Sequence, residues 1–288
     1  MKRFTWIFSA IIYVSLLCSC SQKISGVSSG GQQNQFLCDY NGTKRSFYLY
    51  LPETGNYSET KLVVMLHGYG NSGWSFSVDT EFEKSALPRN FAVLYIDGIP
   101  NASVKGSGPG WNYFYDRNGK ADINFIVDLV QFVQKEYGLS RKTYVAGFSN
   151  GAFMAAKLAV EKSKYFDGFV SVGGMMPKPV WEHKQRGKSG VRFFQINGTK
   201  DDVVPMRLND SAKYNPNPAM EDVIEYFVER NGITAEPVEE KLFDRIKITK
   251  YYDKVWWIII EDFHHSWPTV SNCQLNVNNI ILDFFEND

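Results

Sequence analysis

The sequence has no excess of charge of either sign. Its 288 residues include 31 Lys and Arg against 31 Asp and Glu, so the formal net charge is zero. A nucleic-acid partner would require a clustered basic surface, and nothing in the sequence indicates one. Cysteine and histidine are scarce, with four of each, and their spacing fits no metal site. We therefore expect neither a nucleic-acid-binding protein nor a metalloprotein.

A hydrophobic run of membrane-spanning length is also missing at the N-terminus. Lys2 and Arg3 precede the apolar segment Phe4–Leu17, which is too short for a comfortable span and is typical of an export signal. The segment ends in Leu17-Cys-Ser-Cys20, which resembles a bacterial lipobox with Cys20 as the lipidated residue. An ordinary secretory signal is the alternative. The expectation is an exported bacterial lipoprotein of the periplasm or outer membrane, attached to the membrane through its lipid only.

The remaining chain is expected to form one domain. Residues 1–19 form the signal peptide, and residues 20–35, rich in Ser, Gly and Gln, are expected to be a flexible tether. With 44% hydrophobic residues, residues 36–288 suffice for a single large core. Processing at Cys20 leaves Cys38 and Cys273, and an even pair in an oxidising compartment favours a disulfide. Two independent buried thiols are the alternative.

Strand and helix patterns alternate along this domain, which predicts a mostly parallel, doubly wound sheet. Short apolar or alternating runs predict the strands, and apolar residues at helical spacing predict the helices. The expected strands are Arg45–Leu51, Leu62–Leu66, Phe91–Ile96, a strand before Gly147, Gly168–Val172, Val191–Ile196 and Val255–Ile260. The expected helices are Ile123–Tyr137, Ala152–Lys162, Met220–Val228 and Val277–Phe285.

The most informative motif is Gly147-Phe-Ser149-Asn-Gly151, which lies between a buried strand and an Ala-rich helix. It predicts a nucleophile elbow, a sharp turn that presents Ser149 at the edge of the sheet. The glycines allow close backbone approach and a strained serine. The next backbone N–H, that of Asn150, would point at a developing oxyanion.

A serine hydroxyl needs a base, and the base needs an acid partner. In this architecture the order is Ser, then Asp or Glu, then His. Asp201 or Asp202, in the loop after a buried strand, could supply the acid. The histidine pair at 264–265 follows the last strand and could supply the base.

The loop Leu66-His-Gly-Tyr-Gly70 follows a buried strand and is Gly-rich. A loop in this position donates the second oxyanion N–H, which we assign to the backbone of Tyr69, beside that of Asn150. His67 is then expected to be structural and to bind loop backbone.

Seven motifs occur together and in order, and by them the sequence resembles the polyhydroxybutyrate depolymerase-like esterases. It is similar also to the feruloyl and acetyl xylan esterases of carbohydrate esterase family one. The motifs are His67-Gly-Tyr-Gly70, Tyr95-Ile-Asp-Gly98, Trp111-Asn-Tyr113, Asp122-Ile-Asn-Phe-Ile126, Gly147-Phe-Ser-Asn-Gly151, Gly198-Thr-Lys-Asp-Asp-Val-Val-Pro205 and His265-Ser-Trp-Pro268. The resemblance covers roughly residues 45–286 and implies an α/β-hydrolase fold.

The resemblance implies Ser149 as nucleophile, Asp201 rather than Asp202 as acid, and His265 rather than His264 as base. It also implies that Trp111 and Trp267 flank the acyl or sugar site, although each could be a core aromatic. The expected function is a cofactor-free serine carboxylesterase acting on feruloyl or acetyl esters of plant cell-wall polysaccharide or oligosaccharide. The alternatives are a polyhydroxybutyrate-type polyester depolymerase, a serine peptidase of the same fold, and a non-catalytic glycan-binding lipoprotein.

Overall fold

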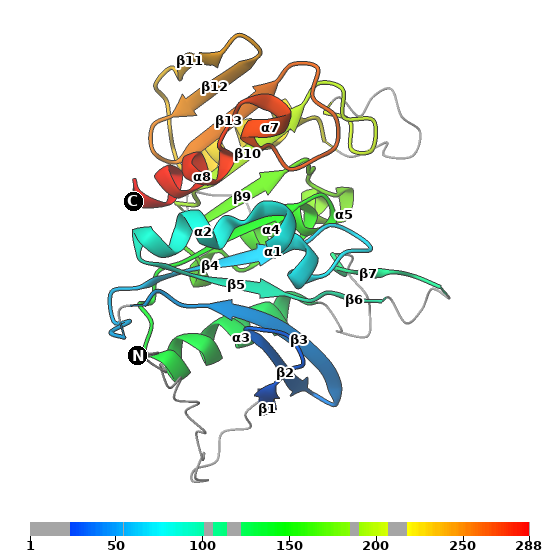
Figure 1. Cartoon of the computed structure of the whole chain (residues 1–288). Coiled ribbons are helices and arrows are strands. Elements are labelled where there is room, and N and C mark those ends of the chain that lie inside the picture. The colour runs from blue at the N-terminus through cyan, green and yellow to red at the C-terminus, as the bar shows by residue number, and fades with distance from the viewer. Residues whose placement is uncertain are drawn as a thin grey trace.

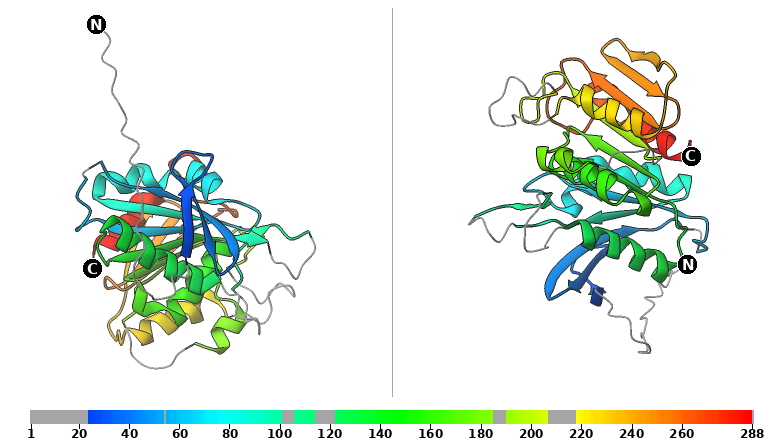
Figure 2. Two further views of the ribbon diagram at one scale, coloured as in Figure 1. Left: turned by 90° about the horizontal axis from the view of Figure 1, so that it is seen from below. Right: turned by 180° about the vertical axis from the view of Figure 1, so that it is seen from behind.

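The computed structural model describes residues 24–53, 55–100, 106–113, 122–184, 190–206 and 218–287. The signal peptide and Cys20 therefore lie outside the described residues. Among the described helices, none combines the length and apolar character needed to cross a membrane. Figures 1 and 2 show one large sheet with helices on both faces, which is the α/β architecture expected from the sequence.

The large sheet has eleven strands in the order β1-β2-β3-β5-β4-β8-β9-β10-β13-β12-β11. Six neighbouring strands from β5 to β13 pair in parallel, and antiparallel strands extend the sheet on both sides. A short antiparallel pair, β6 (Ile99–Pro100) with β7 (Pro109–Gly110), forms a separate ribbon. The strands of the large sheet are β1 (Ile24–Ser29), β2 (Gln35–Tyr40), β3 (Thr43–Tyr50), β4 (Lys61–Leu66), β5 (Phe91–Ile96), β8 (Thr143–Phe148), β9 (Gly168–Val172), β10 (Phe193–Gly198), β11 (Val238–Phe243), β12 (Ile246–Tyr251) and β13 (Val255–Ile260).

The helices divide between the two faces of the sheet, as Figure 1 and the view from behind in Figure 2 show. One face packs its buried side chains against α3 (Asp122–Tyr137), α4 (Asn150–Glu161), α5 (Lys178–Glu182) and α6 (Met220–Arg230). The other face packs against α1 (Gly73–Thr80), α2 (Phe82–Ala86), α7 (Val270–Cys273) and α8 (Val277–Glu286). Two single turns, η1 (Leu87–Arg89) and η2 (Ser163–Tyr165), connect elements. The parallel strands are covered on both faces, which explains their continuous apolar runs.

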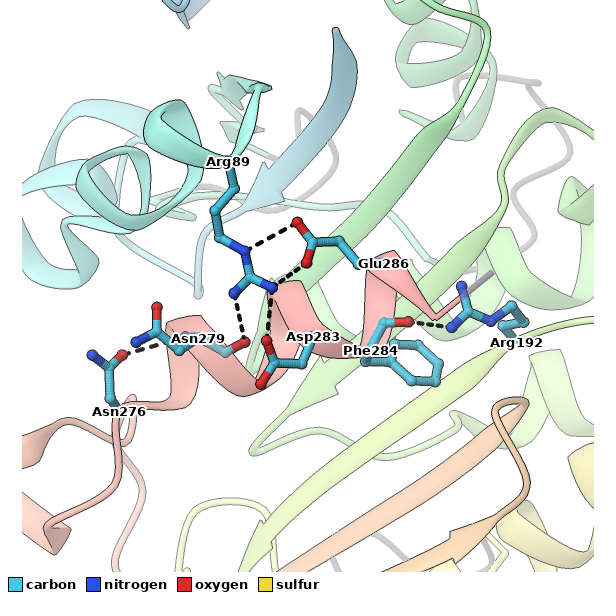
Figure 3. Close-up of polar contacts among 7 residues, drawn as sticks. All are labelled: Arg89, Arg192, Asn276, Asn279, Asp283, Phe284 and Glu286. Atoms are coloured by element: carbon cyan, nitrogen blue, oxygen red, sulfur yellow. Dashed lines mark hydrogen bonds and ion pairs between the residues drawn. The ribbon is translucent and has the colours of Figure 1, made fainter. Parts of the chain in front are cut away.

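The last helix, α8, is held by two arginines from other elements (Figure 3). Arg89 at the end of η1 donates to both carboxylates of Asp283 and Glu286 and to the backbone carbonyl of Asn279. Arg192, beside the start of β10, donates to the backbone carbonyl of Phe284. The apolar side of α8 is meanwhile buried against the sheet. These contacts secure α8, which follows His265 and α7 in the chain.

Two expectations about the organisation of the chain are wrong. The segment 20–35, expected to be a flexible tether, includes β1, which pairs antiparallel with β2 from Ile24 opposite Tyr40 onward. Only Ile24 of β1 is buried, so the hydrophobic pattern of a strand is missing from its sequence. The expected disulfide is also absent. Cys38 and Cys273 are both free, because Cys38 is buried on one face of the sheet and Cys273 packs on the other.

The sheet places its topological switch point between β4 and β8. After β4 the chain adds β5 on one side of it, and β8 then pairs on its other side. In open α/β sheets a crevice forms where successive connections turn to opposite sides, at the carboxyl ends of the strands. The loop that begins at His67 and the turn that holds Ser149 follow these two strand ends directly.

Candidate active site

Ser149 occupies the strand-to-helix turn that its motif predicts. It lies between β8 and α4 with φ 53° and ψ −116°, a strained backbone conformation for a residue with a side chain. Its backbone N–H donates to the Val172 carbonyl at 3.0 Å, and its carbonyl accepts from Phe153 N–H at 3.1 Å. These bonds hold the strained residue on both sides and keep its side chain at the edge of the sheet.

The two glycines of the motif are required by close backbone contacts. A Cβ on Gly147 would lie 2.3 Å from the carbonyl oxygen of Gly151, and a Cβ on Gly151 would lie 2.0 Å from that of Leu66. Real Cβ atoms do not approach this closely, so any other residue would force the turn open. These contacts of both glycines explain why the motif predicts a sharp turn.

Asp201 and His265 form a hydrogen-bonded pair at the same edge of the sheet. His265 Nδ1 lies 2.7 Å from Asp201 Oδ2. The other oxygen, Oδ1, accepts the backbone N–H groups of Val203 and Val204 at 3.0 and 2.7 Å. Asp201 is buried and held by three hydrogen bonds, and a carboxylate can only accept them, so His265 donates from Nδ1 and keeps Nε2 available.

Geometry separates each residue of the pair from its neighbour in sequence. Asp202 and His264 are exposed, whereas Asp201 is buried and His265 is half-buried. The ring of His265 lies over that of Phe148, the residue before Ser149, with centroids 4.8 Å apart. The hydrogen-bonded pair is thus Asp201 with His265, the two residues that the sequence resemblance favours over Asp202 and His264.

The loops that hold this pair are joined by backbone hydrogen bonds. Thr199 N–H donates to the Ile260 carbonyl at 3.0 Å, and Lys200 N–H donates to the Phe263 carbonyl at 3.1 Å. A Cβ on Gly198 would lie 2.2 Å from the Phe263 carbonyl oxygen. The loop after β10 and the loop after β13 therefore form one rigid unit, which fixes Asp201 relative to His265.

The loop after β4 lies beside the serine. A Cβ on Gly68 would lie 3.5 Å from the Cβ of Ser149. Asn150 is the first residue of α4, so its backbone N–H belongs to the turn of a helix whose N–H groups have no partner within the helix. The two expected donors, Tyr69 and Asn150, thus come from segments that adjoin Ser149.

His67 is structural, as expected. It is fully buried, and Gly98 N–H donates to its Nε2 at 2.8 Å. An amide N–H can only donate, so the proton of the ring is on Nδ1, which donates to the Gly68 carbonyl at 2.7 Å. Burial lowers the pKa of His67 below its usual value, so the neutral ring shapes the loop.

Trp111 and Trp267 are buried and do not form an open wall of the site. Trp111 is 4% exposed, and its indole N–H donates to the His67 carbonyl at 2.9 Å. Trp267 is 6% exposed, donates to Asn278 at 3.1 Å and packs edge-on against Phe76. Their expected place beside the acyl or sugar site stays a prediction. Both positions hold core aromatics that support the loops around the site.

Sequence reasoning missed a supporting network under these loops. The buried ion pair of Arg45 and Asp122 has an N–O distance of 2.7 Å. The second oxygen of Asp122 accepts Asn112 N–H at 2.8 Å, and Arg45 also donates to the Asp97 carbonyl at 3.2 Å. The Oδ1 of Asn150 accepts Trp111 N–H at 2.6 Å. Asp97, Trp111 and Asp122 each belong to one of the motifs quoted above, and that membership was the available signal for this network.

A serine on a strained strand-to-helix turn and a histidine–carboxylate pair at the same edge of a mostly parallel sheet define the class of α/β hydrolases. A family model for phospholipases and carboxylesterases matches residues 53–225. The chain therefore belongs to the phospholipase/carboxylesterase family, a family of ester hydrolases, which agrees with the enzyme class expected from the sequence.

The sequence identity to an individual relative is low. The chain is 29% identical over 150 residues to NocK of Nocardia uniformis subsp. tsuyamanensis, which is named as an inferred esterase. That match covers 50% of this chain but only 41% of the relative's length.

Solved structures show the same fold at low identity. The acetyl xylan esterase from Aspergillus awamori superposes with a TM-score of 0.65 and 18% identity, covering 85% of this chain and 94% of that one. An S-formylglutathione hydrolase from Agrobacterium tumefaciens gives 0.61 and 11% identity, with 92% and 99% covered. The carboxylesterase of Bacillus cereus gives 0.52 and 17% identity, with 85% and 95% covered.

Proposed function

We propose that this protein is a serine carboxylesterase that uses Ser149, His265 and Asp201 as a catalytic triad. The observation that carries the proposal is the 2.7 Å hydrogen bond between His265 Nδ1 and a buried Asp201. That bond fixes the tautomer in which Nε2 can accept a proton, at the sheet edge where the elbow presents Ser149.

The chemistry follows from these positions. Ser149 Oγ attacks the ester carbonyl carbon while its proton passes to His265 Nε2, and Asp201 stabilises the imidazolium that forms. The backbone N–H groups of Tyr69 and Asn150 bind the oxyanion. His265 then protonates the leaving alcohol, and water hydrolyses the acyl-enzyme with the same histidine as base. No step in this scheme requires a cofactor.

The proposed substrates are feruloyl or acetyl esters on plant cell-wall polysaccharide. Two lines support this class. The sequence motifs resemble those of feruloyl and acetyl xylan esterases, and the fold matches that of an acetyl xylan esterase from Aspergillus awamori.

We further propose that the protein is an exported lipoprotein with its lipid on Cys20. Membrane fractionation of the wild type beside Cys20→Ser tests this.

The test is hydrolysis of methyl ferulate, acetylated xylan and a short aryl acetate by the wild type and Ser149→Ala. Ferulate release that depends on Ser149 supports the triad and an aromatic acyl site, and acetate release alone assigns the enzyme to deacetylation. His264→Ala serves as the matched control for His265→Ala, because His264 is exposed. Activity retained in Ser149→Ala would reject the mechanism, and no hydrolysis of any ester would favour a peptidase or a glycan-binding protein.

A further inference from the structure

Tyr69 presents a large apolar surface beside the site. Its side chain is 61% exposed, although its neighbours His67 and Gly68 are buried. The same loop approaches Ser149, because a Cβ on Gly68 would lie 3.5 Å from the Cβ of Ser149. Trp111 and Trp267, the aromatics expected to contact substrate, are both buried. Tyr69 is therefore the exposed aromatic that the β4 loop places at the site.

The Tyr69 ring is held from behind by glycines. Gly108 N–H donates to the Tyr69 hydroxyl at 2.7 Å. A Cβ on Gly110 would lie 2.9 Å from Tyr69 Cδ2, and a Cβ on Gly108 would lie 3.5 Å from its Cζ. Gly70 N–H also donates to the Pro109 carbonyl at 2.7 Å. The ring rests on Gly108 and Gly110 in one orientation, so a ligand that binds it meets a surface whose rotamer is already fixed.

The order of strands indicates which part of an ester would reach this ring. Tyr69 follows β4, Ser149 follows β8, and His265 follows β13, on the far side of β9 and β10 from β4. The leaving alcohol must lie near His265, because His265 protonates it. The carbonyl oxygen points at the backbone N–H groups of Tyr69 and Asn150, and the acyl group takes the remaining direction, away from the leaving oxygen. The proposal places that group along the β4 loop, beside the exposed side chain of Tyr69.

We infer that the Tyr69 ring determines specificity by stacking on a planar ring in the acyl group of the substrate, as in aryl-acyl esters of the cinnamate class. The inference rests on the proposed function and deepens it. Offset stacking of two aromatic rings would give an advantage of about two- to tenfold in kcat/KM. Acetyl esters, which lack an acyl ring, gain nothing from this contact.

Three esters test where the aromatic ring of the substrate must lie. Methyl cinnamate carries it in the acyl group, phenyl acetate carries it in the alcohol, and ethyl acetate has none. In Tyr69→Ala the ratio of kcat/KM for methyl cinnamate to that for ethyl acetate should fall about two- to tenfold, mainly through KM. The ratio for phenyl acetate to ethyl acetate should not fall. Using ratios cancels any loss that acts through the backbone N–H of residue 69.

Two variants control the experiment. Tyr69→Phe keeps the ring and should keep the cinnamate ratio. Tyr252→Ala removes another exposed tyrosine, 67% exposed in the turn between β12 and β13, and should leave all three rates unchanged. Thermal unfolding of each variant confirms that it folds.

Each other outcome overturns the inference. An equal loss on all three esters in Tyr69→Ala would mean that residue 69 acts only through its backbone. A fall in the phenyl acetate ratio would place the ring on the alcohol side. Hydrolysis of both acetates without hydrolysis of methyl cinnamate by the wild type would leave no aryl-acyl site, whereas hydrolysis of none of the esters would reject the proposed function itself.

Discussion

At the scale of single residues, Asp201 is the most constrained polar side chain of the site. One carboxylate oxygen accepts two backbone N–H groups, and the other accepts His265. An amide in the same place would keep the shape but bring an N–H group to one of these positions. If that N–H faces His265, the ring must accept at Nδ1 and carry its proton on Nε2, which is the wrong tautomer for a base.

We therefore expect Asp201→Asn to lower kcat by about 10³- to 10⁴-fold with a normal fold. Steady-state kinetics on an ester that the wild type hydrolyses, with circular dichroism as the check on folding, measures this. The matched control is Asp202→Asn, because Asp202 is exposed and should change kcat little. Equal effects of the two substitutions would remove Asp201 from its proposed role.

A second prediction at this scale concerns the pH dependence of stability. Burial holds the pKa of His67 below its usual value, and its two ring nitrogens bind the N–H of Gly98, after β5, and the carbonyl of Gly68. The unfolded chain therefore takes up this proton at a higher pH than the folded one, so the stabilising contribution is complete above about pH 6.5 and is lost as the pH falls.

Thermal unfolding between neutral and mildly acidic pH should show a steeper loss of Tm for the wild type than for His67→Gln. The variant itself should be less stable at neutral pH, because it disturbs a fully buried site. His264→Gln, which changes an exposed histidine, should keep the wild-type slope. An unchanged slope in His67→Gln would contradict the assignment of a buried neutral ring.

At the scale of elements, the loops after β4, β7, β8, β10 and β13 form the site, and the buried pair of Arg45 and Asp122 supports the loop after β7. Arg45 on β3 lies 4.0 Å above the ring of Phe125 on α3 and also binds the Asp97 carbonyl after β5. Asp122 holds Asn112 N–H. One ion pair thus ties β3, β5, α3 and the loop of Trp111 together.

Arg45→Met should destabilise the fold by about 3–5 kcal/mol, because it leaves the Asp122 carboxylate buried without its partner. Chemical denaturation measures the loss. The double variant Arg45→Met with Asp122→Leu removes that unpaired charge, so it should recover part of the stability while its activity stays low. Full recovery of activity in the double variant would mean that the pair does not position the loop.

The same scale shows what the sequence could and could not predict. The buried strands, α3, α4, α6 and α8 were predictable because their apolar patterns report burial on one or both faces. The strands β1 and β11 were not, since nearly all of their side chains are exposed and only pairing with a neighbour makes them strands. The pairing of His265 with Asp201 could be predicted only from the resemblance. The contacts that bring the two residues together, such as that of Gly198 with Phe263, join segments far apart in the sequence.

At the scale of the whole molecule, the sheet separates the two cysteines. Cys38 belongs to the core on the face of α3 and α4, and Cys273 packs with the core on the face of α8. The compartment argument from the sequence favoured a disulfide because composition carries no information on which face a residue occupies. Burial raises the pKa of the Cys38 thiol to about 11, which makes that thiol unreactive in the native state.

Peptide mapping of the non-reduced protein should therefore show Cys38 and Cys273 in separate peptides, each alkylated after denaturation. A reducing agent should leave Tm unchanged. Alkylation of the native protein should be slow at Cys38. A peptide pair linked through these two residues would contradict the arrangement of the sheet faces.

The most direct test of the central claim is the intact mass of the protein after treatment with an organophosphate such as diethyl p-nitrophenyl phosphate. Attack by Ser149 Oγ would displace p-nitrophenolate and leave a diethyl phosphoryl group on the serine. The account predicts one adduct in the wild type, mapped to Ser149, no adduct in Ser149→Ala and much slower labelling in His265→Ala. An unlabelled wild-type protein, or labelling that is unaffected by loss of either residue, would contradict a nucleophilic Ser149 activated by His265.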